Sequence, residues 1–217
     1  MIYKELFAIN QNLNFIFLLF SYFIISYLYA YHYKISKAFI KSSIAERYAV
    51  QYVRDDNVFK QRVNLIFNLL LIFNISVTIW NIISDFQGEF SQWTLIAFIV
   101  GSFYLIKFFI IKFIGLIFLE KQISNFAIYY TFLFDKLFAI ACLPLLVFLY
   151  YFTYDLIAYS LYAFLITYTI FFSIKVYWMI RIGRKYFGIP KFYLFLYICL
   201  LELMPTLLVS FIVINAI

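Results

Sequence analysis

Charge, glycine, proline, cysteine and histidine are all scarce in this sequence of 217 residues. Only 12% of the residues are charged, whereas an ordinary soluble domain has roughly 25%. Because 67% are hydrophobic, a soluble domain of this size could not hide its apolar surface, so the composition indicates an integral membrane protein. The many aromatic residues exclude disorder, and long continuous apolar runs exclude a transmembrane β-barrel, whose strands alternate.

The scarcity of reactive residues argues against most catalytic and metal chemistry. The single histidine, His32, cannot form a bis-histidine haem site or supply a zinc site. Cys142 and Cys199 lie inside apolar runs without CxxC spacing, which predicts buried thiols. No Walker A loop, GxSxG elbow or HExxH motif is present, and five glycines leave little room for the broken helices of transporters. We therefore expect no enzyme activity and no cofactor.

Six long apolar runs predict an all-α integral membrane protein with about six transmembrane helices. A helix of about 20 residues crosses a hydrocarbon core of about 30 Å. The expected spans are residues 13–33, 63–83, 93–118, 126–152, 156–180 and 192–214. No repeat or Gly/Ser linker divides the chain, so residues 1–217 are expected to form a single domain. The first run is too long for a cleavable signal and is expected to stay as a membrane helix.

Basic residues set the expected orientation. Sixteen of the seventeen Lys and Arg lie in or beside the connections after the first, third and fifth spans. The opposite loops carry Asp85, Glu89 and Asp155 but no Lys or Arg. By the positive-inside rule, the basic connections face the cytoplasm and both termini lie outside. The net charge of +7 is thus assigned to the membrane surface, which argues against a nucleic-acid partner.

The stretch Lys34–Arg62 is the largest soluble segment that the sequence predicts. It has no Gly or Pro, so we expect it to be a cytoplasmic helix. Three lysines on one face of this helix are interpreted as an anchor on anionic lipid headgroups, with a docking site for a partner as the alternative. The expected surface anchors are Lys34, Lys37 and Lys41, together with Arg181, Arg184 and Lys185 after the fifth span.

Two charged residues inside the third and fourth spans fall at the same depth. The turn between these spans centres near Lys121, with Lys107 14 residues before it and Asp135 14 residues after it. In an antiparallel hairpin they would therefore meet, and a salt bridge lets both be buried with less penalty than either alone. The favoured interpretation is a clamp between helices, and the alternative is an ion or substrate site.

Glu202 lies near the middle of the sixth span, beside a proline that removes a backbone donor and kinks the helix. Lys175 on the fifth span is the nearest basic residue by level, and a structural and a functional carboxylate both remain open. The second span carries an amide face that is interpreted as hydrogen bonding between helices, with a permeation path as the alternative. This candidate polar site comprises Glu202, Pro205, Lys175, Asn68 and Asn74, with Asn64, Thr78 and Asn81 on the same face.

The stretch Leu196-Tyr-Ile-Cys-Leu-Leu-Glu-Leu-Met-Pro205 resembles the signature of domain of unknown function 4271. Two weaker similarities lie at residues 62–74 and at Tyr104-x-x-Lys107. Members of this family are small polytopic inner-membrane proteins of Gram-negative bacteria. The resemblance therefore implies an inner-membrane location and gives weight to Glu202, but it implies no mechanism.

Taken together, these features predict a non-catalytic inner-membrane protein. We expect a structural or accessory subunit of a membrane or cell-envelope assembly, in contact with the lipid bilayer and with other membrane proteins. The alternative is a small ion or solute carrier that uses Glu202, Lys175 and the asparagine face of the second span. An enzyme of lipid or cell-envelope metabolism ranks third.

Overall fold

The computed structural model describes residues 2–45, 48, 58–83, 90–117, 121–151 and 157–187. All of the secondary structure in these ranges is helical. The helices are α1 (Ile2–Tyr31), α2 (Tyr33–Ile44), α4 (Val58–Ile83), α5 (Phe90–Ile117), α6 (Lys121–Tyr151) and α7 (Ile157–Phe187).

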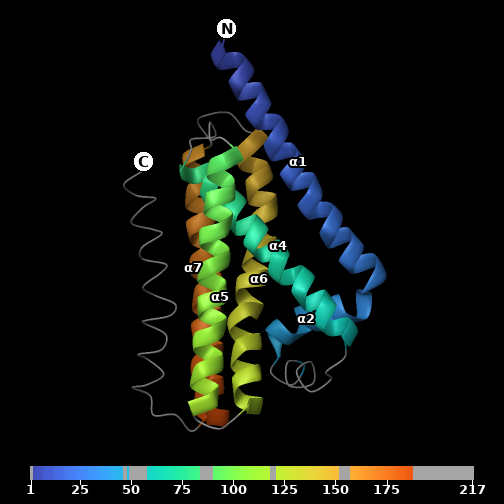
Figure 1. The fold of residues 1–217 in the computed structure, drawn as a ribbon, viewed down its shortest axis with the longest axis vertical. Coiled ribbons are helices and arrows are strands. Elements are labelled where there is room, and N and C mark those ends of the chain that lie inside the picture. The colour runs from blue at the N-terminus through green and yellow to red at the C-terminus, as the bar shows by residue number, and fades with distance from the viewer. Residues whose placement is uncertain are drawn as a thin grey trace.

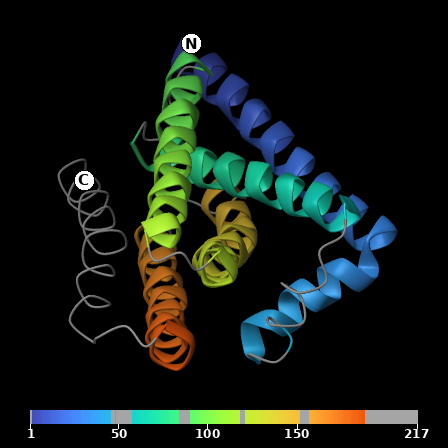
Figure 2. The same ribbon diagram turned by 60° about the horizontal axis from the view of Figure 1, so that its bottom comes forward.

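Helix α6 is the centre of the described fold, because it contacts each of the other five helices. Helices α5 and α7 run alongside it, whereas α1 and α2 lie on its other side (Figure 1). Helix α4 crosses obliquely and contacts both α5 and α6, as the turned view also shows (Figure 2). A polar side chain on α6 can therefore bond to several helices at once.

Five of these helices are long and apolar enough to cross a membrane. Their candidate spans are Leu13–Tyr31, Gln61–Asn81, Phe90–Phe113, Ile128–Phe148 and Tyr162–Arg181. The first five predicted spans thus each fall on such a helix, with ends shifted by a few residues. Helices α5 and α6 continue without a break through their lysines, although these charges interrupt the apolar runs. The predicted sixth span, 192–214, lies outside the described residues.

The first span ends earlier than predicted, because the chain turns a corner at His32. That residue has non-helical backbone angles, φ −123° and ψ 37°, and α2 begins directly after it. The corner is closed by hydrogen bonds: the His32 N–H donates to the Leu28 carbonyl, and the Ser36 hydroxyl donates to the same carbonyl over 3.1 Å. Docking of α2 against the bundle therefore fixes where α1 stops.

Helix α2 is also shorter than the helix expected between Lys34 and Arg62. It ends at Ile44, and Ala45 is extended with φ −138° and ψ 130°. Ser42 and Ser43 donate to the carbonyls of Phe39 and Ile40, at 2.6 and 2.7 Å. Such local side-chain bonds compete with the helical ladder, which accounts for the end of the helix at this point.

Two clusters of buried apolar residues lie along α6. One cluster joins α1, α2, α4, α6 and α7 and includes Leu28, Phe39, Phe67, Leu133 and Trp178. The other lies toward the opposite end of α6 and includes Leu18, Val77, Cys142, Leu146 and Phe164. The Cys142 thiol is buried, as the sequence predicts, and Cys199 lies outside the described residues.

Candidate functional site

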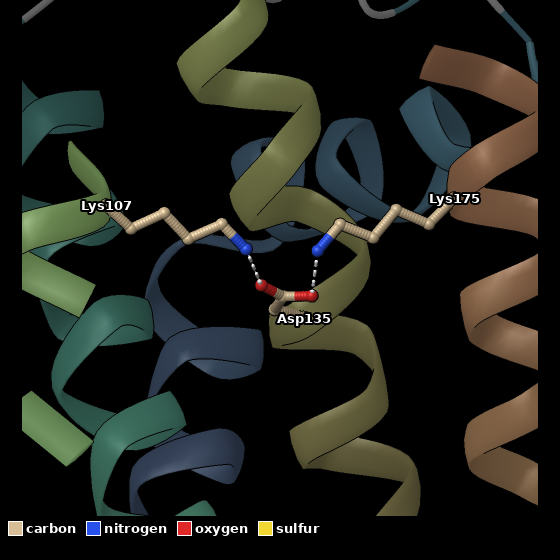
Figure 3. Close-up of polar contacts among 3 residues, drawn as sticks. All are labelled: Lys107, Asp135 and Lys175. Atoms are coloured by element: carbon tan, nitrogen blue, oxygen red, sulfur yellow. Dashed lines mark hydrogen bonds and ion pairs between the residues drawn. The ribbon is translucent and has the colours of Figure 1, made fainter. Parts of the chain in front are cut away.

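A single carboxylate joins three helices in the interior. Asp135 of α6 accepts a hydrogen bond from the ammonium of Lys107 on α5 at 3.4 Å and another from the ammonium of Lys175 on α7 at 2.6 Å. The two lysines approach from opposite sides, and each bonds a different carboxylate oxygen (Figure 3). Both lysine side chains are at most 4% exposed and the aspartate side chain is 17% exposed. We call these three residues the Asp135 cluster.

The Asp135 cluster lies inside the spans, at one level. Lys107 is six residues from Phe113, Lys175 is six residues from Arg181, and Asp135 is seven residues from Ile128. At 1.5 Å per residue, all three lie about 10 Å from the same end of their spans. A lone charge at this depth would be costly, so the two ion pairs are what allow these groups to be buried.

A third buried lysine lies beside the Asp135 cluster and faces another helix. Lys136 of α6 donates to the Asn64 amide oxygen of α4, and its ammonium lies 6.0 Å from the centre of the Phe39 ring. Asp135 is the one acidic residue within the five described spans. These buried groups therefore comprise three lysines and one carboxylate, and the interior at this level is rich in positive charge.

The asparagine face of α4 forms bonds between helices. Asn74 accepts from the Ser21 hydroxyl of α1 at 2.6 Å and donates to the Ala139 carbonyl of α6 at 3.2 Å. Asn64 bonds α6 through Lys136. Asn81 instead donates to the Val77 carbonyl of its own helix.

Asn68 is half-buried, and its amide oxygen has no hydrogen-bond partner among the described residues. Thr78 donates to the Asn74 carbonyl of its own helix at 2.8 Å. The predicted amide face is thus divided between bonds that join helices, at Asn64 and Asn74, and groups that do not.

The three lysines of the predicted surface anchor are exposed on α2. Lys37 donates to the Tyr33 hydroxyl at 3.0 Å, and this hydrogen bond together with the ammonium charge lowers the pKa of Tyr33. The same hydrogen bond raises the pKa of Lys37 above its ordinary value. Lys41 lies 5.4 Å from the centre of the Tyr48 ring.

The other predicted residues lie partly or wholly outside the described part of the chain. Glu202 and Pro205 lie outside the described residues, so their proximity to Lys175 stays a prediction. Arg184 and Lys185 are in the last turn of α7, and their side chains are likewise outside the description. Arg181 is exposed and lies 5.5 Å from the centre of the Trp178 ring. Within the described ranges, no three His, Cys, Asp or Glu residues gather as metal ligands would.

The bond between Lys175 and Asp135 is the feature that the sequence analysis missed. Lys175 was expected at the level of Glu202, whereas the structure places the Lys175 ammonium on the carboxylate of Asp135. A signal was present, because the midpoint between the two residues is residue 155, in the connection between the predicted fourth and fifth spans. The counting that paired Lys107 with Asp135 would also have found Lys175.

Five apolar helices with charges paired between them define the class as a multi-pass helical membrane protein. The model of the family described as Domain of unknown function (DUF4271) matches residues 14–212, and the chain belongs to this family. The resemblance of the carboxy-terminal stretch to that family is thereby confirmed. No curated protein and no solved structure matches the chain.

Proposed function

We propose that this protein is a non-catalytic subunit of a bacterial inner-membrane or cell-envelope assembly, with a structural or accessory role. The observation that carries the proposal is the Asp135 cluster, in which each carboxylate oxygen holds a lysine from a different neighbouring helix. Charges arranged in this way tie α5 and α7 to α6. They serve the packing of helices and not the passage of a solute.

The polar groups of α4 support the same role. Asn74 joins α1, α4 and α6, and Asn64 joins α4 and α6. In lipid, where apolar surface does not drive helices together, such bonds and close packing hold a bundle in one arrangement. A rigid bundle of this kind suits a protein that presents a fixed surface to its neighbours.

The surface available to those neighbours is apolar and aromatic. Phe98 and Phe113 of α5 and Tyr162 of α7 are each more than 60% exposed. These side chains can contact lipid or the helices of another membrane protein. Both contacts belong to the proposal, with the basic ends of the helices toward the cytoplasm and both termini outside.

Photo-crosslinking in cells tests the proposal. A photoreactive residue at Phe98 or Tyr162 should form an adduct with one membrane protein in stoichiometric yield, while the same residue at buried Leu133 should not. The same partner should also co-purify with the native protein, which carries no photoreactive residue. Adducts with lipid alone, from a protein that purifies without a partner, would contradict the role of a subunit.

A second candidate is a small ion or solute carrier, and one observation favours it. Within the described spans, three lysines and one carboxylate are buried near the level of the Asp135 cluster, about 10 Å inside the spans. An excess of buried positive charge can attract an anion. Anion flux into liposomes that contain the purified protein, abolished by Lys136→Met, would favour the carrier over the subunit.

A further inference from the structure

Helix α2 packs against the bundle with one narrow face. Ser36, Phe39 and Ser42 are buried there, within about 120° of the helix circumference. The Phe39 ring stacks on Phe67 of α4 with centroids 4.7 Å apart, and the hydroxyls of Ser42 and Tyr129 lie 2.5 Å apart. This face fixes the position of α2 on α4 and α6.

A second face of α2 is apolar and exposed. Tyr33, Ile40 and Ile44 fall within about 40° of the circumference and are 43%, 49% and 74% exposed. Water is an unfavourable solvent for these side chains, so their position indicates contact with the apolar part of the bilayer.

The third face of α2 is basic and adjoins the apolar one. Lys34, Lys37 and Lys41 are exposed within about 60° of the circumference. The Lys37 ammonium is held at the edge of the apolar face, because it donates to the Tyr33 hydroxyl and lies 5.1 Å from the centre of that ring. The order of faces around the helix is therefore packed, apolar and basic.

The contacts of α2 also give its depth. Phe67 lies six residues inside the span that begins at Gln61, and Tyr129 lies one residue inside the span that begins at Ile128. Along the helix axes this is at most about 9 Å from the ends of the spans. Amphipathic helices that lie in the membrane surface insert their apolar face to about 5–10 Å.

We infer that α2 is an interfacial helix that binds anionic phospholipid headgroups through Lys34, Lys37 and Lys41. Tyr33, Ile40 and Ile44 lie among the upper acyl chains, while the three ammonium groups meet the phosphates of the cytoplasmic leaflet. The bound lipids hold α2 against the bundle, where Phe39 covers the buried Lys136. This inference requires that the protein lies in a membrane, but it does not depend on whether the protein is a subunit or a carrier.

Lipid selectivity tests the inference. The full chain is reconstituted in nanodiscs of phosphatidylcholine with a minor fraction of phosphatidylglycerol, and the lipids retained after release are counted by native mass spectrometry. The test variant is Lys34→Gln/Lys41→Gln, which leaves the bond between Lys37 and Tyr33 in place. The matched control, Arg62→Gln/Lys112→Gln, removes the same charge from exposed residues of α4 and α5 on the same side of the bundle.

The native protein and the control should both retain phosphatidylglycerol in preference. The α2 variant should lose this preference by up to about fivefold for each lysine removed. Equal losses in the two variants would show a general attraction of charge and overturn the inference. So would a native protein without preference, or an α2 variant that keeps its lipid but loses a bound protein.

A fluorescence measurement tests the apolar face without changing any charge. Ile40→Trp adds a fluorophore to α2, and the emission of the native protein is subtracted. Phospholipids brominated near the headgroup end of the acyl chain should quench the added emission, while iodide in the water should not. Quenching by iodide alone would place this face in water and overturn the inference.

Discussion

Lys175 of α7 lies 2.6 Å from Asp135 of α6, closer than the 3.4 Å that separates Lys107 of α5 from the same carboxylate. The sequence-based clamp is therefore a joint between three helices and not a hairpin contact between two. Because α6 contacts every other described helix, a joint on α6 positions the helix on which the others pack.

Asn74 should stabilise the fold more than Asn81, although both are buried on α4. Asn74→Leu leaves the Ser21 hydroxyl and the Ala139 carbonyl without the partners they have now, which should cost about 1–3 kcal/mol of unfolding free energy. Asn81→Leu is the matched control, because the Asn81 amide bonds its own helix and its oxygen has no described partner. Thermal unfolding in detergent measures both. A larger loss of stability for Asn81→Leu than for Asn74→Leu would contradict this prediction.

Lys136 distinguishes the two proposed roles. Its ammonium bonds the Asn64 amide and lies over the Phe39 ring, while the neighbouring Asp135 carboxylate is already bonded to two other lysines. Replacement by an apolar residue of similar length therefore removes a buried charge that has no carboxylate of its own. If the protein is a subunit, Lys136→Met should keep or raise the melting temperature and retain the partner. Loss of anion flux into liposomes in a stably folded Lys136→Met protein would instead support the carrier.

The orientation follows from the basic ends of the helices. Single cysteines at Gln87 and Lys185 should react with a membrane-impermeant reagent from opposite sides, Gln87 from outside and Lys185 from the cytoplasm. A cysteine at Lys41 on α2 should behave like the one at Lys185. Labelling of Gln87 and Lys185 from the same side would be incompatible with six spans.

The sequence predicted the features that depend on periodicity and counting. The first five spans follow from apolar length, and the common depth of Lys107 and Asp135 follows from their equal distance to Lys121. The end of α2 at Ile44 was not predicted, because no Gly or Pro marks it and only the local bonds of Ser42 and Ser43 oppose the helix. The corner at His32 was not predicted, because it depends on how α2 packs on α4 and α6. The bond between Lys136 and Asn64 was missed for the same reason, since it is set by the crossing of two helices.

Glu202 lies outside the described residues, and its role stays a prediction that substitution can test. Glu202→Gln keeps the shape and the hydrogen bonding of the side chain but removes its titratable proton. A structural carboxylate should tolerate this change with normal abundance and partner binding, measured by immunoblot and co-purification. A proton- or cation-coupled role should be lost while the protein still folds. An unchanged Glu202→Leu protein would show that the residue is not central.

The central claim is that the Asp135 cluster is structural, with three charges that balance one another between α5, α6 and α7, and combined substitutions test it most directly. Asp135→Leu should lower the unfolding free energy by about 3–5 kcal/mol, because two buried lysines lose their carboxylate. Lys107→Met/Asp135→Leu/Lys175→Met removes all three charges and should be far better tolerated. The measurement is thermal unfolding of the purified proteins, with co-purification of the partner from the same cells. We expect a triple variant that is stable and keeps its partner. An Asp135→Leu protein as stable as the native one, or a triple variant that folds but loses its partner, would show that the cluster is not a structural joint.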